Sequence, residues 1–129
     1  MPQPVFSSTA TKRILVVDDD YDIRDVIRRA VEERGWTCDE AFNGVDSISQ
    51  ARAHPPDLIV LDLAMPVMNG YEASLTLRRE FPNIPIVFLS MYADVVGRSS
   101  ARVLDVHAIL SKSDGVANLI RRIEKLLPS

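Results

Sequence analysis

The sequence has little cysteine, no long apolar run and no excess of positive charge, and each shortage excludes a class of protein. The single cysteine, Cys38, leaves no partner for an internal disulfide and fits a reducing compartment. No apolar run approaches the roughly 20 residues that a membrane-spanning helix needs, and the start of the chain lacks the apolar stretch of a secretory signal. The formal net charge of -3 argues against a nucleic-acid-binding surface. We therefore expect a cytoplasmic protein that contacts neither a membrane nor nucleic acid directly.

The composition is that of one globular domain. The chain has 129 residues, of which 47% are hydrophobic and 26% are charged, enough for one hydrophobic core but not for a second domain. Residues 1–12 are rich in serine, threonine and proline without periodicity, which predicts a flexible tail. We expect the folded domain to span residues 13–127.

Beyond the tail, short apolar runs alternate with segments of helical periodicity. Clear buried strands are expected at residues 13–17, 57–61 and 86–90, a weaker one at 36–41, and a last strand at 106–110. Helices are expected between and after them, with apolar stripes or end signals at residues 23–31, 45–53, 70–80, 94–104 and 116–127. This alternation predicts an α/β fold, a doubly wound, five-stranded parallel sheet flanked by five helices.

Two of the expected helices have distinctive local sequences. Asn69 is placed to cap the helix at 70–80, with Glu72 three residues on completing a capping box. The helix at 94–104 is the poorest of the five, because Gly97 and two serines are mediocre helix formers. It is either a surface helix that needs little packing or an element that rearranges, and the sequence favours neither interpretation.

Polar side chains gather at the carboxyl ends of the expected strands, the edge where open parallel sheets bind ligands. They are Asp18, Asp19 and Asp20 after the first strand, Asp62 after the third, and Ser90, Ser111 and Lys112 at the last two. Two carboxylates about 4 Å apart repel by roughly 4 kcal/mol at an effective dielectric constant of ~20. A hard divalent cation such as Mg²⁺ takes oxygen ligands and would offset this repulsion. Asp20 suits the N-cap of the following helix better than a metal site.

Four motifs in order, "ILVVDDD", "LIVLDLAMPVMNG", "IVFLS" and "ILSKS", carry a family resemblance. Together they resemble the receiver domain of bacterial two-component response regulators, the fold of the chemotaxis regulator CheY. The resemblance covers residues 13 to about 127. It implies a signalling domain that accepts a phosphoryl group and catalyses only its own phosphorylation and dephosphorylation.

The resemblance also implies a role for each polar residue at the sheet edge. Asp62 would be the phosphoacceptor. Asp19, Asp62 and the backbone carbonyl of Ala64 would hold Mg²⁺, or Mn²⁺ in its place, with Asp18 assisting through water. Ser90 would hydrogen-bond a phosphoryl oxygen and Lys112 would pair with the phosphate, which suits a reaction that depends on positioning and charge neutralisation.

Two positions depart from the family pattern. Ile109 stands where the family usually has an aromatic switch residue, and isoleucine is stiff at χ1 and has no hydroxyl. We expect the switch to run instead from Ser90 through the loop after it, with Tyr92 as a candidate aromatic. Ser113 follows Lys112 where the family commonly has proline after a cis peptide bond, and a non-proline cis bond costs about 2.5–4 kcal/mol. The sequence leaves open whether this peptide is cis or is trans with Lys112 aimed a little differently.

Three functions compete. The leading one is a phosphorylation-driven switch of a protein-interaction surface. The second is a degenerate receiver that acts as a phosphorylation-independent interaction module, although every residue of the expected site is present. The third is a phosphatase resembling the haloacid dehalogenases, since Asp18 and Asp20 match an Asp-x-Asp spacing, but the expected Gly-Thr is replaced by Tyr21 and Asp22.

The leading function implies an upstream partner that donates the phosphoryl group and a downstream partner that binds the switched surface. The phosphoryl donor would be a sensor histidine kinase or a histidine phosphotransfer protein. The downstream partner would be a protein that binds the face built from residues 94–104, 106–110 and 116–127. Four arginines on this face form either a partner surface or a solvated charged surface: Arg98, Arg102, Arg121 and Arg122. We expect either a stand-alone receiver or the receiver part of a longer regulator.

Overall fold

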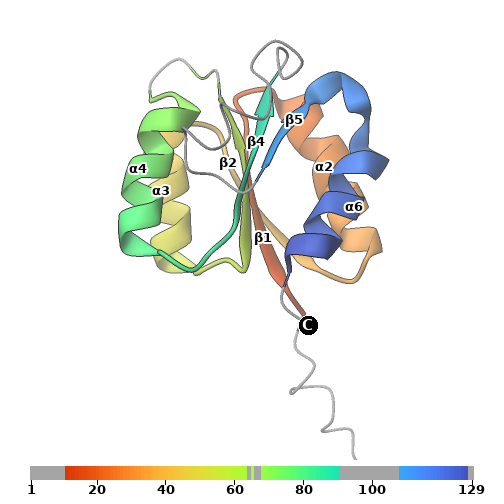
Figure 1. Cartoon of the computed structure of the whole chain (residues 1–129), viewed down its shortest axis with the longest axis horizontal. Coiled ribbons are helices and arrows are strands. Elements are labelled where there is room, and N and C mark those ends of the chain that lie inside the picture. Colours follow the sequence, from red (N-terminus) through yellow and green to blue (C-terminus); the bar gives the residue numbers. More distant parts are fainter. Residues whose placement is uncertain (1–10, 64, 66–67, 91–107, 128–129) are drawn as a thin grey trace, which may run out of the picture.

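The computed structural model describes residues 11–63, 65, 68–90 and 108–127. Its strands form one parallel sheet in the order β2-β1-β3-β4-β5 (Figure 1). They are β1 (Arg13–Val17), β2 (Thr37–Ala41), β3 (Leu58–Asp62), β4 (Ile86–Ser90) and β5 (Ala108–Ser111). The expected five-stranded parallel sheet is confirmed.

Helices cover both faces of this sheet. Those within the described residues are α2 (Tyr21–Glu33), α3 (Gly44–Ala53), α4 (Gly70–Glu80) and α6 (Val116–Leu126), with a short 3₁₀ turn η1 (Lys112–Asp114). Figure 1 shows α3 and α4 on one face and α2 and α6 on the other, which is the doubly wound arrangement. The expected tail at 1–12, apart from its last two residues, and the expected helix at 94–104 lie outside the described residues.

The sheet is apolar on both faces because both are covered. Ile14 and Val16 of β1 face the cluster with Ile27 of α2 and Ile123 of α6. The alternate residues Leu15 and Val17 belong to a second cluster on the face of α3 and α4, with Phe88 fully buried among them. Two cores therefore hold one sheet, and its buried acidic residues, Asp18 and Asp62, lie at the carboxyl ends of β1 and β3.

The boundaries of the elements follow the sequence closely, with small shifts. The strands at 13–17 and 86–90 are confirmed, whereas the strand expected at 57–61 runs from Leu58 to Asp62. Asp57 instead accepts a hydrogen bond from the backbone N–H of Arg13 at 2.8 Å. It therefore links the starts of β1 and β3, at the end of the sheet opposite to the carboxylates. Asp62 is thus the last residue of β3 rather than a residue after it.

Local capping residues start two of the helices as the sequence predicts. The Asp20 side chain accepts hydrogen bonds from the N–H groups of Asp22 and Ile23, and the Asn69–Glu72 capping box is formed. The apolar stripe expected within residues 23–31 is wrong at one position, because Val26 of α2 is 52% exposed. Within the described residues no helix is long and apolar enough to span a membrane.

Candidate functional site

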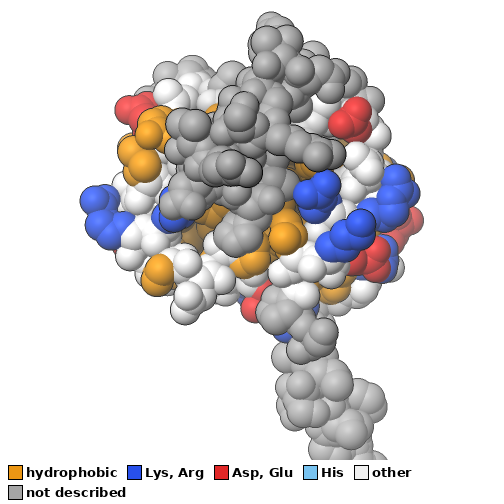
Figure 2. Space-filling view, viewed as in Figure 1, with side chains coloured by type: hydrophobic (Ala, Val, Ile, Leu, Met, Phe, Trp, Pro, Cys, Tyr) orange, Lys and Arg blue, Asp and Glu red, His pale blue; other side chains and the backbone are white. Residues whose placement is uncertain are grey.

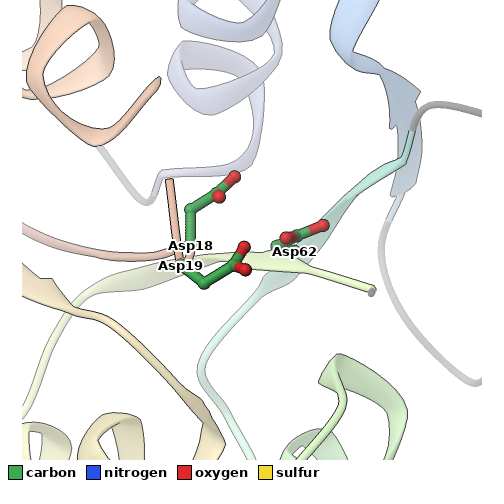
Figure 3. A group of neighbouring side chains, drawn as sticks. All are labelled: Asp18, Asp19 and Asp62. Atoms are coloured by element: carbon green, nitrogen blue, oxygen red, sulfur yellow. The ribbon is translucent and has the colours of Figure 1, made fainter. Parts of the chain in front are cut away.

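Three carboxylates meet at the carboxyl edge of the sheet. Asp18 and Asp19 follow β1, and Asp62 ends the neighbouring strand β3 (Figure 3). One oxygen of each lies within 4.8 Å of the others. Asp18 and Asp62 are buried, at 0% and 2% exposure, whereas Asp19 is exposed. The predicted acidic cluster therefore forms, with two buried members and one that faces solvent.

Lys112 brings a positive charge to the two buried carboxylates. Its Nζ lies 3.0 Å from Oδ2 of Asp18 and 3.3 Å from Oδ1 of Asp62. Burial lowers the pKa of Lys112, but its interactions with Asp18 and Asp62 outweigh this effect and hold the pKa above the ordinary lysine value. Lys112 is therefore a cation at neutral pH and compensates part of the buried negative charge.

Most polar atoms of Asp18, in the backbone and in the side chain, form hydrogen bonds. Its N–H donates to the carbonyl of Ala41 at 3.1 Å, and its carbonyl accepts from Nη1 of Arg24 at 2.7 Å. Its Oδ1 accepts from the N–H of Asp20 at 2.9 Å. Only Oδ2 accepts no well-directed hydrogen bond, although it is buried and pairs with the Lys112 ammonium.

This arrangement fits a hard divalent cation. Three carboxylates lie together beside the Lys112 ammonium, whose one positive charge offsets only part of their negative charge. The cluster offers oxygen ligands and no nitrogen or sulfur, the donor set that Mg²⁺ prefers. The residues present therefore suit Mg²⁺.

The end of β3 is fixed by a close backbone approach. The N–H of Leu63 donates to the carbonyl of Leu89 at 3.0 Å, and the N–H of Gly70 donates to Leu63 at 2.9 Å. A Cβ added to Gly70 would lie 2.1 Å from the carbonyl oxygen of Asp62, so only glycine fits there. The sequence carries no local signal for the role of Gly70, which depends on its close approach to the Asp62 carbonyl. The same holds for Arg24, whose role depends on reaching back to Asp18.

Ser90 and Ser111 complete the described edge. Both are buried, at 6% and 5% exposure, and they end the neighbouring strands β4 and β5 in register. Asp62 pairs with Leu89 of β4, so Ser90 lies one residue further along β4 than the residue paired with Asp62. The predicted serine and lysine positions therefore come to the same edge as the carboxylates.

Three predicted positions are described only in part or not at all. Ala64 and Tyr92 lie outside the described residues. Ile109 is in register with Phe88 of β4, and its side chain lies outside what the structure describes. The peptide between Lys112 and Ser113 is trans, since none of the described peptides is cis.

The sequence and the fold both match known proteins. The family model for the response regulator receiver domain matches residues 14–124. The chain is 33% identical to the response regulator MprA of Mycobacterium ulcerans over 115 residues, covering 89% of this chain and 50% of MprA. It is 31% identical to SphR of Synechococcus elongatus, an alkaline phosphatase synthesis transcriptional regulatory protein, covering 94% of this chain and 51% of SphR.

Solved structures agree with this assignment. The structure of TrrA from Thermotoga maritima, a response regulator in complex with Mg²⁺-BeF, has a TM-score of 0.81 and 31% identity, and the match covers 91% of this chain and 100% of TrrA. Chemotaxis protein CheY4 of Vibrio cholerae has a TM-score of 0.84 at 23% identity, with 92% and 100% covered, and shows the shared fold. The chain spans about half the length of the curated relatives it matches. It belongs to the response regulator receiver domain family, the signalling modules of two-component systems.

Proposed function

We propose that this chain accepts a phosphoryl group on Asp62, in a Mg²⁺-dependent reaction, from the phosphohistidine of a sensor kinase or a histidine phosphotransfer protein. The observation that carries the proposal is the grouping of Asp18, Asp19 and Asp62 within 4.8 Å, with Lys112 3.0 Å from Asp18 and 3.3 Å from Asp62. This grouping places a nucleophilic carboxylate beside a compact cation, the pairing that phosphoryl transfer requires.

The carboxylates of Asp19 and Asp62 would hold the metal directly, together with the backbone carbonyl of Ala64, and Asp18 would assist through water. When bound, Mg²⁺ supplies positive charge to the phosphoryl oxygens and to the acidic cluster. TrrA, whose structure holds Mg²⁺-BeF, supports this assignment as a relative of the same fold. The grouping of three carboxylates against the one positive charge of Lys112 supports it from this chain itself.

In the transfer, an oxygen of the Asp62 carboxylate attacks the phosphorus and the bond from phosphorus to the donor's imidazole nitrogen breaks. The bonding pair stays on that nitrogen, so the donor leaves as neutral histidine after it takes up a proton. Lys112 is a cation at neutral pH, since the lowering of its pKa by burial is outweighed by Asp18 and Asp62, and it shifts its charge from Asp62 to a phosphoryl oxygen. The Asp18 contact at 3.0 Å keeps the ammonium at the edge while it does so.

The resulting acyl phosphate would act on the neighbouring strand ends. We propose that the Ser90 hydroxyl, at the buried end of β4, hydrogen-bonds a phosphoryl oxygen and carries the change toward the loop that follows, with Tyr92 rather than Ile109 supplying any aromatic contact. The downstream protein would bind the face that includes α6. Figure 2 shows Lys and Arg side chains over α6 with Asp and Glu side chains beside them, and Arg121, Arg122 and Glu124 of this helix are exposed.

The experiment is the intact mass of the protein after incubation with acetyl phosphate, with and without Mg²⁺. We expect one added phosphoryl group on the wild type in Mg²⁺, none in its absence, and none on Asp62→Asn. Asp114→Asn, which changes an exposed carboxylate in η1, is the matched control and should be phosphorylated as the wild type is. No added mass on the wild type in Mg²⁺ would reject the proposal and favour an unphosphorylated interaction module.

A further inference from the structure

We propose that Arg24, braced by Glu40, is a positioning residue that fixes the peptide between Asp18 and Asp19 and so presents both carboxylates to the cation. Arg24 contacts neither the phosphoryl group nor the metal in this role. The inference rests on the proposed function, because it assigns Arg24 to the assembly of the proposed Mg²⁺ site.

Arg24 reaches the acidic turn because of its place in α2. Its N–H donates to the carbonyl of Asp20 at 3.1 Å in the first turn of the helix. Helical side chains lean toward the helix N-terminus, and Nη1 of Arg24 donates to the carbonyl of Asp18 at 2.7 Å. The Arg24 side chain is only 15% exposed, and its guanidinium lies 5.6 Å from the centroid of the Tyr21 ring. This is a shielded, charge-assisted hydrogen bond of the stronger kind.

Glu40 holds the other side of the guanidinium. It lies on β2, a different element, and its Oε1 accepts from Nε of Arg24 at 3.1 Å. Its second oxygen lies 3.4 Å from Nε of Arg28. The guanidinium therefore links the edge strand β2 to the Asp18 carbonyl through two separate N–H groups. A lysine has a single ammonium and lacks this fork.

The Asp18 carbonyl matters because it shares a planar peptide with the N–H of Asp19. A hydrogen bond to that carbonyl fixes the direction in which the chain leaves Asp18. Asp19 is exposed, and within the described residues its carboxylate has no hydrogen bond or ion pair of its own. The place from which it reaches toward Asp62 therefore depends on the backbone that Arg24 holds.

The test measures Mg²⁺ binding to the full chain by isothermal titration calorimetry, for wild type, Arg24→Gln, Arg24→Lys and Glu40→Gln. Loss of an outer-shell partner typically costs 10–100-fold in metal affinity, so we expect the Kd of Arg24→Gln to rise about 10-fold. We expect smaller rises for Arg24→Lys and Glu40→Gln. Arg29→Gln, on the same helix at 73% side-chain exposure, is the matched control and should leave the Kd unchanged.

Two further readouts separate positioning from general damage. In the metal-free protein, the Asp20 amide that donates to Asp18 Oδ1 should lose hydrogen-exchange protection in Arg24→Gln but not in Arg29→Gln. With acetyl phosphate, Arg24→Gln should need more Mg²⁺ but recover most of the wild-type rate at saturation. A folded Arg24→Gln that binds Mg²⁺ as tightly as Arg29→Gln would overturn the inference.

The remaining outcomes also decide. If Arg24→Gln does not fold, Glu40→Gln replaces it, since that variant keeps Arg24 and removes only its brace; unchanged Mg²⁺ affinity there would overturn the inference. If the wild type binds no Mg²⁺, the proposed function falls and the inference falls with it. If the wild type binds Mg²⁺ and is phosphorylated while the Arg24 variants match the control, the inference alone fails.

Discussion

The ends of β1 and β3 both place a buried aspartate at the same edge, but they are held there in different ways. The chain leaves β1 through Asp18 to Asp20 and enters α2 at once, with Asp20 capping the helix and donating to Asp18. The chain leaves β3 through a longer loop and enters α4 only at Gly70. There the fixing contacts come from Leu89 on β4 and from Gly70, which packs against the Asp62 carbonyl. One end is held mostly by near neighbours in sequence, the other by residues brought together by folding.

Lys112 connects the two ends, and its removal is the largest expected perturbation. Lys112→Met would leave two buried carboxylates without their shared cation, and breaking a buried pair in this way costs about 3–5 kcal/mol. We expect a fall of about 3 kcal/mol in the free energy of unfolding of the metal-free protein, measured by urea denaturation. Lys125→Met, on the exposed surface of α6, should change it by less than about 0.5 kcal/mol. Equal effects of the two variants would mean that Lys112 does not stabilise the cluster.

The stability that Lys112 contributes should depend on pH. Burial lowers the pKa of Lys112, but Asp18 and Asp62 outweigh it, so the folded-state pKa stands above the ordinary 10.5. A raised pKa contributes stability in full below the unfolded-state value and loses it as the pH rises through the folded-state value. The difference in unfolding free energy between wild type and Lys112→Met should therefore be constant from pH 7 to about 10 and shrink above 10.5. A difference that shrinks between pH 7 and 9 would contradict this assignment.

The Gly70→Ala variant should perturb the end of β3 without changing the end of β1. The added Cβ would lie 2.1 Å from the Asp62 carbonyl oxygen, so the backbone that carries Asp62 must move. Overpacking of this kind costs about 1–3 kcal/mol, and we expect a loss near 3 kcal/mol together with slower phosphorylation by acetyl phosphate. Gly35→Ala is the control: its φ of 82° is unfavourable for alanine, but no atom lies within 4 Å of the new Cβ. It should cost about 1 kcal/mol and leave phosphorylation unchanged.

The helix caps test whether local contacts hold the two ends equally. Asp20 caps α2 after β1, and Asn69 caps α4 after the loop that follows β3. Replacing either by alanine should cost about 1 kcal/mol of unfolding free energy. Asp20→Ala should in addition weaken Mg²⁺ binding, because the turn that it stabilises carries Asp18 and Asp19. If Asn69→Ala weakens Mg²⁺ binding as much as Asp20→Ala does, the contrast between the two ends does not hold.

Much of the fold is predictable because its signals are local. The apolar runs at 13–17 and 86–90 match β1 and β4, and the capping residues Asp20 and Asn69 act as expected. The prediction failed at Val26 because helical periodicity does not show how far the neighbouring elements cover an apolar stripe. Val26 lies at the margin of the stripe of α2 and remains exposed. Asp62 was expected directly after its strand because the apolar run ends at Leu61. The pairing of β3 with β4 continues one residue further and includes Asp62.

The sequence by itself determined the alternation of strands and helices, the acidic and basic residues available at the strand ends, and the family resemblance that the family model then confirmed. Only the tertiary structure decided how deeply Asp18 and Asp62 are buried and that Lys112 reaches both. It also decided that Gly70 must lack a side chain and that Arg24 bridges Glu40 to the Asp18 carbonyl. The physical reason is range: periodicity and capping act within one or two turns of the chain. Desolvation, ion pairing and close backbone approach depend on groups that become neighbours only when the sheet is assembled.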